Sequence, residues 1–213
     1  MLDSIVAPLR DIDWNNIETV HAAATDALNA LDTPGLLGKA VEDITNRPEL
    51  RALCEHYDIL DKLVLHDDPT GVRIRLHIFG PGHFDRPHNH RWSYASRILA
   101  GSYQHFQFGN VEVDENQKPA ALRTLHCRTE SAGDTYTLHH TMVHAVTAEA
   151  DTVSLIVRGP AVKDRFLVMD RNAGTAWWQY GAAQESPEDA AAKRMTKDRL
   201  QQRISNLRVW GLT

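Results

Sequence analysis

An alternation of apolar and basic residues in the middle of the chain is the feature that most constrains its fold. Between Val72 and Ile78, apolar side chains occupy every second position, and Arg73, Arg75 and His77 occupy the positions between them. Successive side chains of an extended strand point to opposite faces of a sheet. The pattern therefore predicts a β-strand with one apolar and one polar face.

Further short segments of strand composition follow, separated by Gly, Pro, Asp and Asn residues. The predicted strands are 96–108 with a bend at Gly101, 121–128, 135–140, 152–158, 166–169 and 177–180. Many short strands joined by turn residues are typical of an antiparallel barrel or sandwich. We expect the middle of the chain to be mainly β.

Both ends of the chain have helical patterns. Asp13 is a candidate cap for a helix that ends before Pro34, a second helix is expected over 36–44, and a third begins near Pro48. Ser186-Pro187 begins a C-terminal helix. We expect one domain over 1–213, with a helical segment at 1–60, a β-barrel at 61–182, and a C-terminal helix at 186–208, the helices packing outside the barrel.

Composition excludes several classes of protein. The formal charge is −5, which argues against the basic footprint of a nucleic-acid-binding protein. The sequence contains no apolar run of about 18 residues, and its beginning lacks the apolar core of a signal peptide. We expect a cytoplasmic protein without a nucleic-acid or membrane partner, either a monomer or a homodimer.

Most of the twelve histidines lie between His77 and His144, and three of them form a candidate metal site. His88 and His90 are two residues apart, so on an extended chain their side chains point to the same side. Pro87 stiffens the approach, and His144 can arrive from a later strand. Three imidazoles suit iron, zinc, copper or nickel, and leave coordination positions open.

The spacing around these histidines resembles the cupin superfamily. Gly82 is followed by His88, His90 and Gly101 at the distances of the first cupin motif, and Gly133 precedes His144 by eleven residues, as in the second. The acid of the first motif falls on Tyr94 or Ala95, so the likeness is to three-histidine cupins. The chain is similar to the thiol dioxygenases, including cysteine dioxygenase, over about residues 60–160. The resemblance implies a jelly-roll-like cupin barrel with iron(II) on His88, His90 and His144.

The chain departs from the thiol dioxygenases at residues that handle the substrate. Ala95 stands where animal enzymes carry a cross-linking cysteine. The Ser-His-Tyr relay of the family would fall on Ser154, Ile156 and Arg158, and its carboxylate-binding arginine near Lys62. The resemblance therefore implies the metal site but not a thiol substrate.

Three further residues are candidates for substrate handling. Arg158 occupies the tyrosine position of the relay, and Arg97 shares the parity of Ala95 on its strand. A buried guanidinium requires an anionic partner and matches a carboxylate at two points, so either arginine could bind a substrate carboxylate. Alternatively, both point outward or pair with a local acid such as Asp164. The hydroxyl of Tyr94 is a candidate hydrogen-bond donor beside the metal.

The leading hypothesis is a mononuclear iron(II) oxygenase or dioxygenase, whose partners are dioxygen and a small carboxylate, amino acid or thiol. One alternative is an isomerase or lyase that uses zinc, nickel or manganese without oxygen. A third is a cupin that binds a metabolite without catalysis. The sequence leaves all three open.

Overall fold

The computed structural model describes residues 2–110, 122–181 and 184–213. The helices are α1 (Leu2–Arg10), α2 (Ile17–Leu31), α3 (Pro34–Asn46), α4 (Pro48–Ala52), α5 (Pro187–Ala192) and α6 (Lys197–Val209). The strands are β1 (Glu55–Tyr57), β2 (Leu60–Asp67), β3 (Arg73–Phe79), β4 (Tyr94–Ala100), β5 (Ser102–Asn110), β6 (His126–Ser131), β7 (Thr135–Leu138), β8 (Met142–Ala148), β9 (Val153–Arg158), β10 (Arg165–Asp170) and β11 (Thr175–Tyr180).

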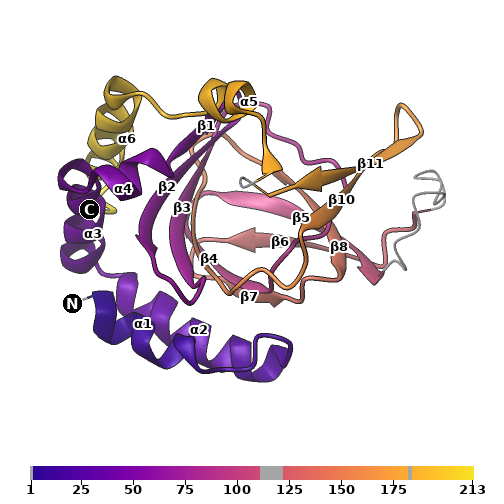
Figure 1. Ribbon diagram of the computed structural model, residues 1–213, viewed down its shortest axis with the longest axis horizontal. Helices are drawn as coiled ribbons and strands as arrows, with labels where there is room; N and C mark the ends of the chain where they lie inside the picture. Colours follow the sequence, from indigo (N-terminus) through magenta and orange to yellow (C-terminus); the bar gives the residue numbers. More distant parts are fainter. Residues whose placement is uncertain (1, 111–121, 182–183) are drawn as a thin grey trace.

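The described strands form three antiparallel sheets around a common interior (Figure 1). The largest sheet has the order β1-β2-β3-β9-β4-β7, a second has the order β6-β5-β8, and β10 pairs with β11. Isolated bridges join His88 to His144 and to Val168. The expected mainly β architecture is confirmed. A closed barrel is not seen among the described strands, because the hydrogen-bonded ladders stop at the edges of the three sheets.

Helices cover the outer face of the six-stranded sheet, and both chain ends lie on this side (Figure 1). Ile74, Leu76 and Ile78 of β3 belong to the same buried cluster as Leu28 of α2 and Leu207 of α6. The apolar face of the alternation therefore packs under the helices. The register of β3 with β9 turns Arg73, Arg75 and His77 to the interior, together with Ser154, Ile156 and Arg158.

Some predicted elements have different bounds in the structure. Asn16, rather than Asp13, caps α2 through its side-chain oxygen, because Asp13 lies three residues further from the helix. The expected single C-terminal helix is two helices, since Thr196 starts a second one with its own cap. Gly101 takes φ +73° and separates β4 from β5, as the predicted bend requires. The predicted strand 121–128 begins outside the described residues, and β6 starts at His126.

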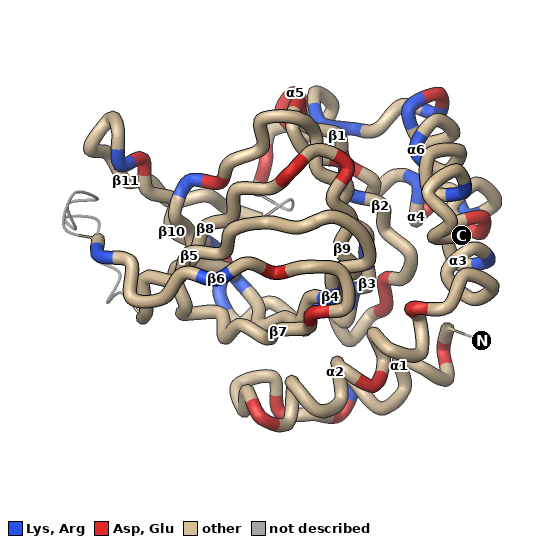
Figure 2. Tube along the Cα trace, turned by 180° about the vertical axis from the view of Figure 1, so that it is seen from behind, with Lys and Arg blue, Asp and Glu red and all other residues tan. Residues whose placement is uncertain are grey.

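Acidic and basic residues are interspersed along the chain trace (Figure 2). Along α6, for example, Lys197, Asp198 and Arg199 follow one another. No helix in the described part of the chain is both long and apolar enough to span a bilayer.

Candidate metal centre

His88, His90 and His144 meet in the interior and form a group that can hold a metal ion. Their candidate ligand atoms all lie within 4.8 Å of one another. His88 and His144 pair as in a β-bridge, each donating its backbone N–H to the other's carbonyl oxygen at 2.9 Å. His90 follows in the loop before β4, and its backbone N–H lies 3.3 Å from the carbonyl oxygen of His140. The structure thus brings together the three histidines that the spacing singled out.

Hydrogen bonds at the other ring nitrogens select the tautomers that a metal site needs. Nδ1 of His88 lies 2.8 Å from the carbonyl oxygen of Arg86, which can only accept, so Nδ1 carries the proton and Nε2 is left with its lone pair. Ring nitrogens held in this way keep a ligand in the orientation for coordination. His88 therefore offers Nε2 to an ion.

A buried relay orients His144. Nδ1 of His144 lies 3.1 Å from Nε2 of His105, and Nδ1 of His105 lies 3.0 Å from the carboxylate of Glu130. Glu130 in turn accepts two hydrogen bonds of 2.6 Å from Arg128. Because an ionised carboxylate accepts, the proton order along the relay leaves the lone pair of His144 on Nε2. Apart from His105 on a predicted strand, nothing in the sequence indicated this relay.

The distance between the imidazoles of His90 and His144 indicates what the site can bind. Their Nε2 atoms lie 2.8 Å apart, and burial lowers the pKa of both rings well below the usual value. At this distance one neutral ring can donate a hydrogen bond to the other, or both rings can offer their Nε2 lone pairs to one cation. The donor set therefore fits a metal ion, and nitrogen ligands of this kind suit iron, zinc, copper and nickel.

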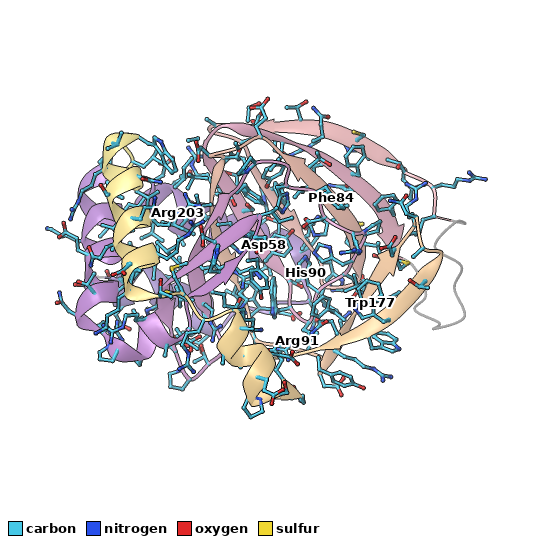
Figure 3. All side chains as sticks on the ribbon, turned by 90° about the horizontal axis from the view of Figure 1, so that it is seen from above. Asp58, Phe84, His90, Arg91, Trp177 and Arg203 are labelled. Carbon is cyan, nitrogen blue, oxygen red and sulfur yellow. The ribbon has the colours of Figure 1, made fainter. Side chains whose placement is uncertain are left out.

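The three-histidine group opens on a cavity of about 770 Å³. The described strands contribute aromatic and charged side chains to its wall, and β10, β11 and α5 border it. In Figure 3, His90 lies among the strands, with Phe84, Arg91 and Trp177 around it. Phe84 and Trp177 are both substantially exposed, so they lie at the mouth. The cavity is large enough to bind an organic substrate beside the ion.

Tyr94, one of the candidate residues, lies at the cavity beside the histidines, and so does Trp92. The Tyr94 hydroxyl is 3.3 Å from Nε2 of His144, and the Trp92 indole stacks on the His90 ring with centroids 4.6 Å apart. Burial raises the pKa of Tyr94 well above its usual value, so the hydroxyl keeps its proton across the neutral range. Tyr94 is a hydrogen-bond donor at the open side of the site.

Arg97 is not part of the cavity wall. Its Nε donates to Asp32 of α2 at 2.6 Å, and its Nη1 donates to the carbonyl oxygen of Gly133 at 2.8 Å. β4 turns the side chains of Tyr94, Ser96 and Ile98 to the interior. Arg97 and Ala95 lie on the opposite face of the strand, which packs under the helices. The expectation that Arg97 binds substrate is corrected by this placement.

Arg158 does line the cavity, together with an arginine that the sequence reading missed. Arg158 donates to the carbonyl oxygens of Gly71 and Gly159, and its guanidinium carbon lies 5.3 Å from the centre of the Trp92 ring. The guanidinium carbon of Arg75 lies 5.0 Å from the centre of the same ring. The signal for Arg75 was present in the β3 alternation, because a strand whose apolar face packs under helices turns its basic face inward.

Lys62, near the expected position of the family's carboxylate-binding arginine, already has an acidic partner. Its ammonium lies 3.6 Å from Glu55 and 4.5 Å from the centre of the Tyr57 ring. Burial lowers the pKa of Lys62 to about 8. Lys62 is therefore less suited than Arg158 or Arg75 to bind an incoming anion.

Comparison with known proteins adds the following findings. No family model and no curated protein matches the sequence. Similar solved structures include KdgF from Halomonas sp., with 18% identity over 49% of this chain and 82% of that chain and a TM-score of 0.39. They also include an RmlC-like cupin from Shewanella frigidimarina, with 17% identity over 52% of this chain and 86% of that chain and a TM-score of 0.40. By its own geometry, the described part of the chain is a mainly β structure with a three-histidine group that can hold a metal.

Proposed function

We propose that this chain is a three-histidine cupin that binds iron(II) on His88, His90 and His144 and oxidises a small anionic substrate with dioxygen. The observation that carries the proposal is the convergence of three imidazoles, within 4.8 Å and without a carboxylate in the group, on a cavity that also exposes arginine side chains. Bound iron(II) supplies the redox chemistry and the open coordination positions for substrate and dioxygen.

The residues of the chain would position the reactants. Arg158 binds a substrate carboxylate, because its guanidinium lines the cavity and hydrogen-bonds to backbone carbonyl oxygens rather than to an acid. Tyr94 donates a hydrogen bond to an oxygen atom at the open side of the site. The proton stays on Tyr94, since burial raises the pKa of the phenol.

The relay from Glu130 through His105 supports the same proposal. It holds His144 in one tautomer and one orientation, and its last member is the fully buried carboxylate of Glu130. Such partners behind metal-binding histidines raise metal affinity by orienting the ligand. A purely structural trio of histidines would not need this arrangement.

Oxygen uptake after anaerobic loading with iron(II) tests the proposal. The iron-loaded protein is screened with small carboxylic acids, amino acids and thiols, and His144→Ala is the matched negative control. We expect uptake with an anionic substrate, and Arg158→Ala should weaken the apparent affinity for that substrate. Full iron loading without uptake for any compound would reject the oxygenase class. Turnover under nitrogen with zinc, nickel or manganese would favour an isomerase or lyase instead.

A further inference from the structure

Two guanidinium groups of the cavity wall, those of Arg75 and Arg158, form no ion pair with an acidic side chain among the described residues, although Glu55 attracts Arg75 and Asp67 attracts Arg158. Arg158 is only 8% exposed, and it donates hydrogen bonds to the backbone carbonyl oxygens of Gly71 and Gly159. Nε of Arg75 is buried without a hydrogen-bond partner in the described part of the chain. An uncompensated buried charge is costly, so a ligand that supplies the missing negative charge is expected.

Most of the other basic residues of the cavity wall form ion pairs with nearby acids. Arg73 pairs with Asp67, Arg86 with Asp170, and Lys62 and Lys193 with Glu55. Arg91 donates to the carbonyl oxygen of Asp164 nearer the rim. Arg75 and Arg158 therefore differ from Arg73, Arg86, Lys62 and Lys193 in forming no ion pair with a carboxylate.

The two guanidinium groups lie together rather than at opposite ends of the cavity. Both stack against Trp92, with guanidinium carbons 5.0 Å and 5.3 Å from the ring centre. Burial, together with the positive charges of Arg73 and Arg75, lowers the pKa of Arg158 to about 9. Two like charges that share one indole repel each other, and a singly charged ligand would neutralise only half of their charge.

The subsite is adjacent to the metal centre. The Trp92 indole that carries both arginines stacks on His90, and Arg158 pairs across the sheet with Tyr94, whose hydroxyl contacts His144. A substrate that binds the arginines at one end can therefore reach the ion with its other end. One aromatic ring separates the two positions.

We propose that Arg75 and Arg158 form a subsite for a doubly charged oxyanion group, and that the substrate carries such a group next to its reacting end. The shared chemistry is that of a phosphate or phosphonate group, or of two neighbouring carboxylates, each of which offers several acceptor oxygens to two guanidinium groups. The statement about the reacting end of the substrate rests on the proposed function. The arginine pair itself can be tested without a metal.

Calorimetric titration of the full chain tests the subsite. The probes are inorganic phosphate and malonate as doubly charged anions and acetate as a singly charged anion, at constant ionic strength. Each titration is made with iron(II) under nitrogen and after chelator treatment. We expect at least one doubly charged probe to bind about tenfold or more tightly than acetate, with or without iron. Phosphate and malonate then distinguish a phosphate-type group from a pair of carboxylates.

Three variants complete the experiment. Arg75→Gln and Arg158→Gln should each weaken binding of the preferred doubly charged probe roughly 30-fold or more. Arg73, on the same strand as Arg75, is paired with Asp67 of β2, and Arg73→Gln should change the affinity for the probe by less than about threefold. Equal affinity for acetate, or loss of binding in only one of the first two variants, would overturn the paired subsite. Binding that requires iron and ignores both arginines would do the same.

Thermal unfolding without added anion gives a second readout if glutamine is poorly tolerated at position 75. Arg75→Met replaces only the unbranched first part of the side chain and removes the charge, so the melting temperature should stay the same or rise. A clear fall would mean that Arg75 supports the fold and would contradict the proposal. If both arginines bind the doubly charged probes but iron-loaded protein consumes no oxygen, the subsite stands and the proposed function fails.

Discussion

Nε2 of His105 lies 3.1 Å from Nδ1 of His144, and both rings are almost fully buried. This contact links the metal-binding face of His144 to Glu130, 3.0 Å from the far side of His105. The carboxylate is thus coupled to His144, a candidate metal ligand, without belonging to the three-histidine group. A substitution two residues removed from the ion should change how tightly the ion binds.

Replacing Glu130 should weaken metal binding without abolishing it. Glu130→Gln removes the charge that fixes the proton order of the relay, so affinity should fall about 10- to 100-fold. Competition with a coloured chelator measures the change. His126→Gln, at an exposed position of the same strand, is the control and should bind like the wild type. An unchanged affinity in Glu130→Gln would show that the relay is only structural.

Arg97 should matter for stability but not for the site. Its ion pair with Asp32 fastens β4 to α2 and is partly exposed. Arg97→Gln should therefore lower the free energy of unfolding by about 1 kcal/mol or less and leave metal affinity unchanged. Urea unfolding of both single variants and of the double variant with Asp32→Asn measures the pair. Loss of metal binding in Arg97→Gln would restore Arg97 to the site.

Asp61 should be among the residues most important for stability. Its carboxylate is 1% exposed and accepts hydrogen bonds from Arg199 at 2.8 Å and Arg203 at 2.5 Å, which fastens α6 to β2. Asp61→Asn leaves the buried Arg203 and the partly exposed Arg199 without their counter-charge and should cost about 3–5 kcal/mol. Chemical unfolding measures the loss, and Asp58→Asn, at an exposed neighbouring position, should be nearly neutral. Equal stability of both variants would contradict this account.

The contribution of Asp61 should depend on pH. Burial alone would raise the pKa of Asp61, but the hydrogen bonds from Arg199 and Arg203 outweigh it and hold the pKa below the usual value. The unfolded chain takes up the proton near pH 4, so the stabilisation is complete above that value and is lost as the pH falls toward the folded pKa. The difference in unfolding free energy between wild type and Asp61→Asn should shrink below about pH 4. A difference that grows on acidification would have the wrong sign.

The sequence predicted the three-histidine group because its information is local. His88 and His90 are fixed two residues apart, and the spacing from Gly133 to His144 places the third ring on a hairpin that returns to the same interior. Close spacing on extended chain converts directly into a shared face. The expected mainly β architecture follows from the same periodicity.

The lining of the cavity could not be predicted in the same way. Which face of β3 looks inward depends on the helices that pack on the other face, and these lie far away in the sequence. Arg75 was therefore missed, and Arg97 was expected in the cavity because a neighbouring position was assumed to face it. The sequence also cannot show that Thr196 caps a second helix where the stripe of apolar residues continues.

Metal content of the protein is the most direct test of the central claim. Wild-type protein, loaded anaerobically with iron(II) and freed of excess metal, should retain one ion per chain. His90→Ala and His144→Ala should each lose it, whereas His21→Ala, on the exposed side of α2, should retain it. Retention of a full equivalent by either of the first two variants, or no retention by the wild type, would contradict the three-histidine metal centre.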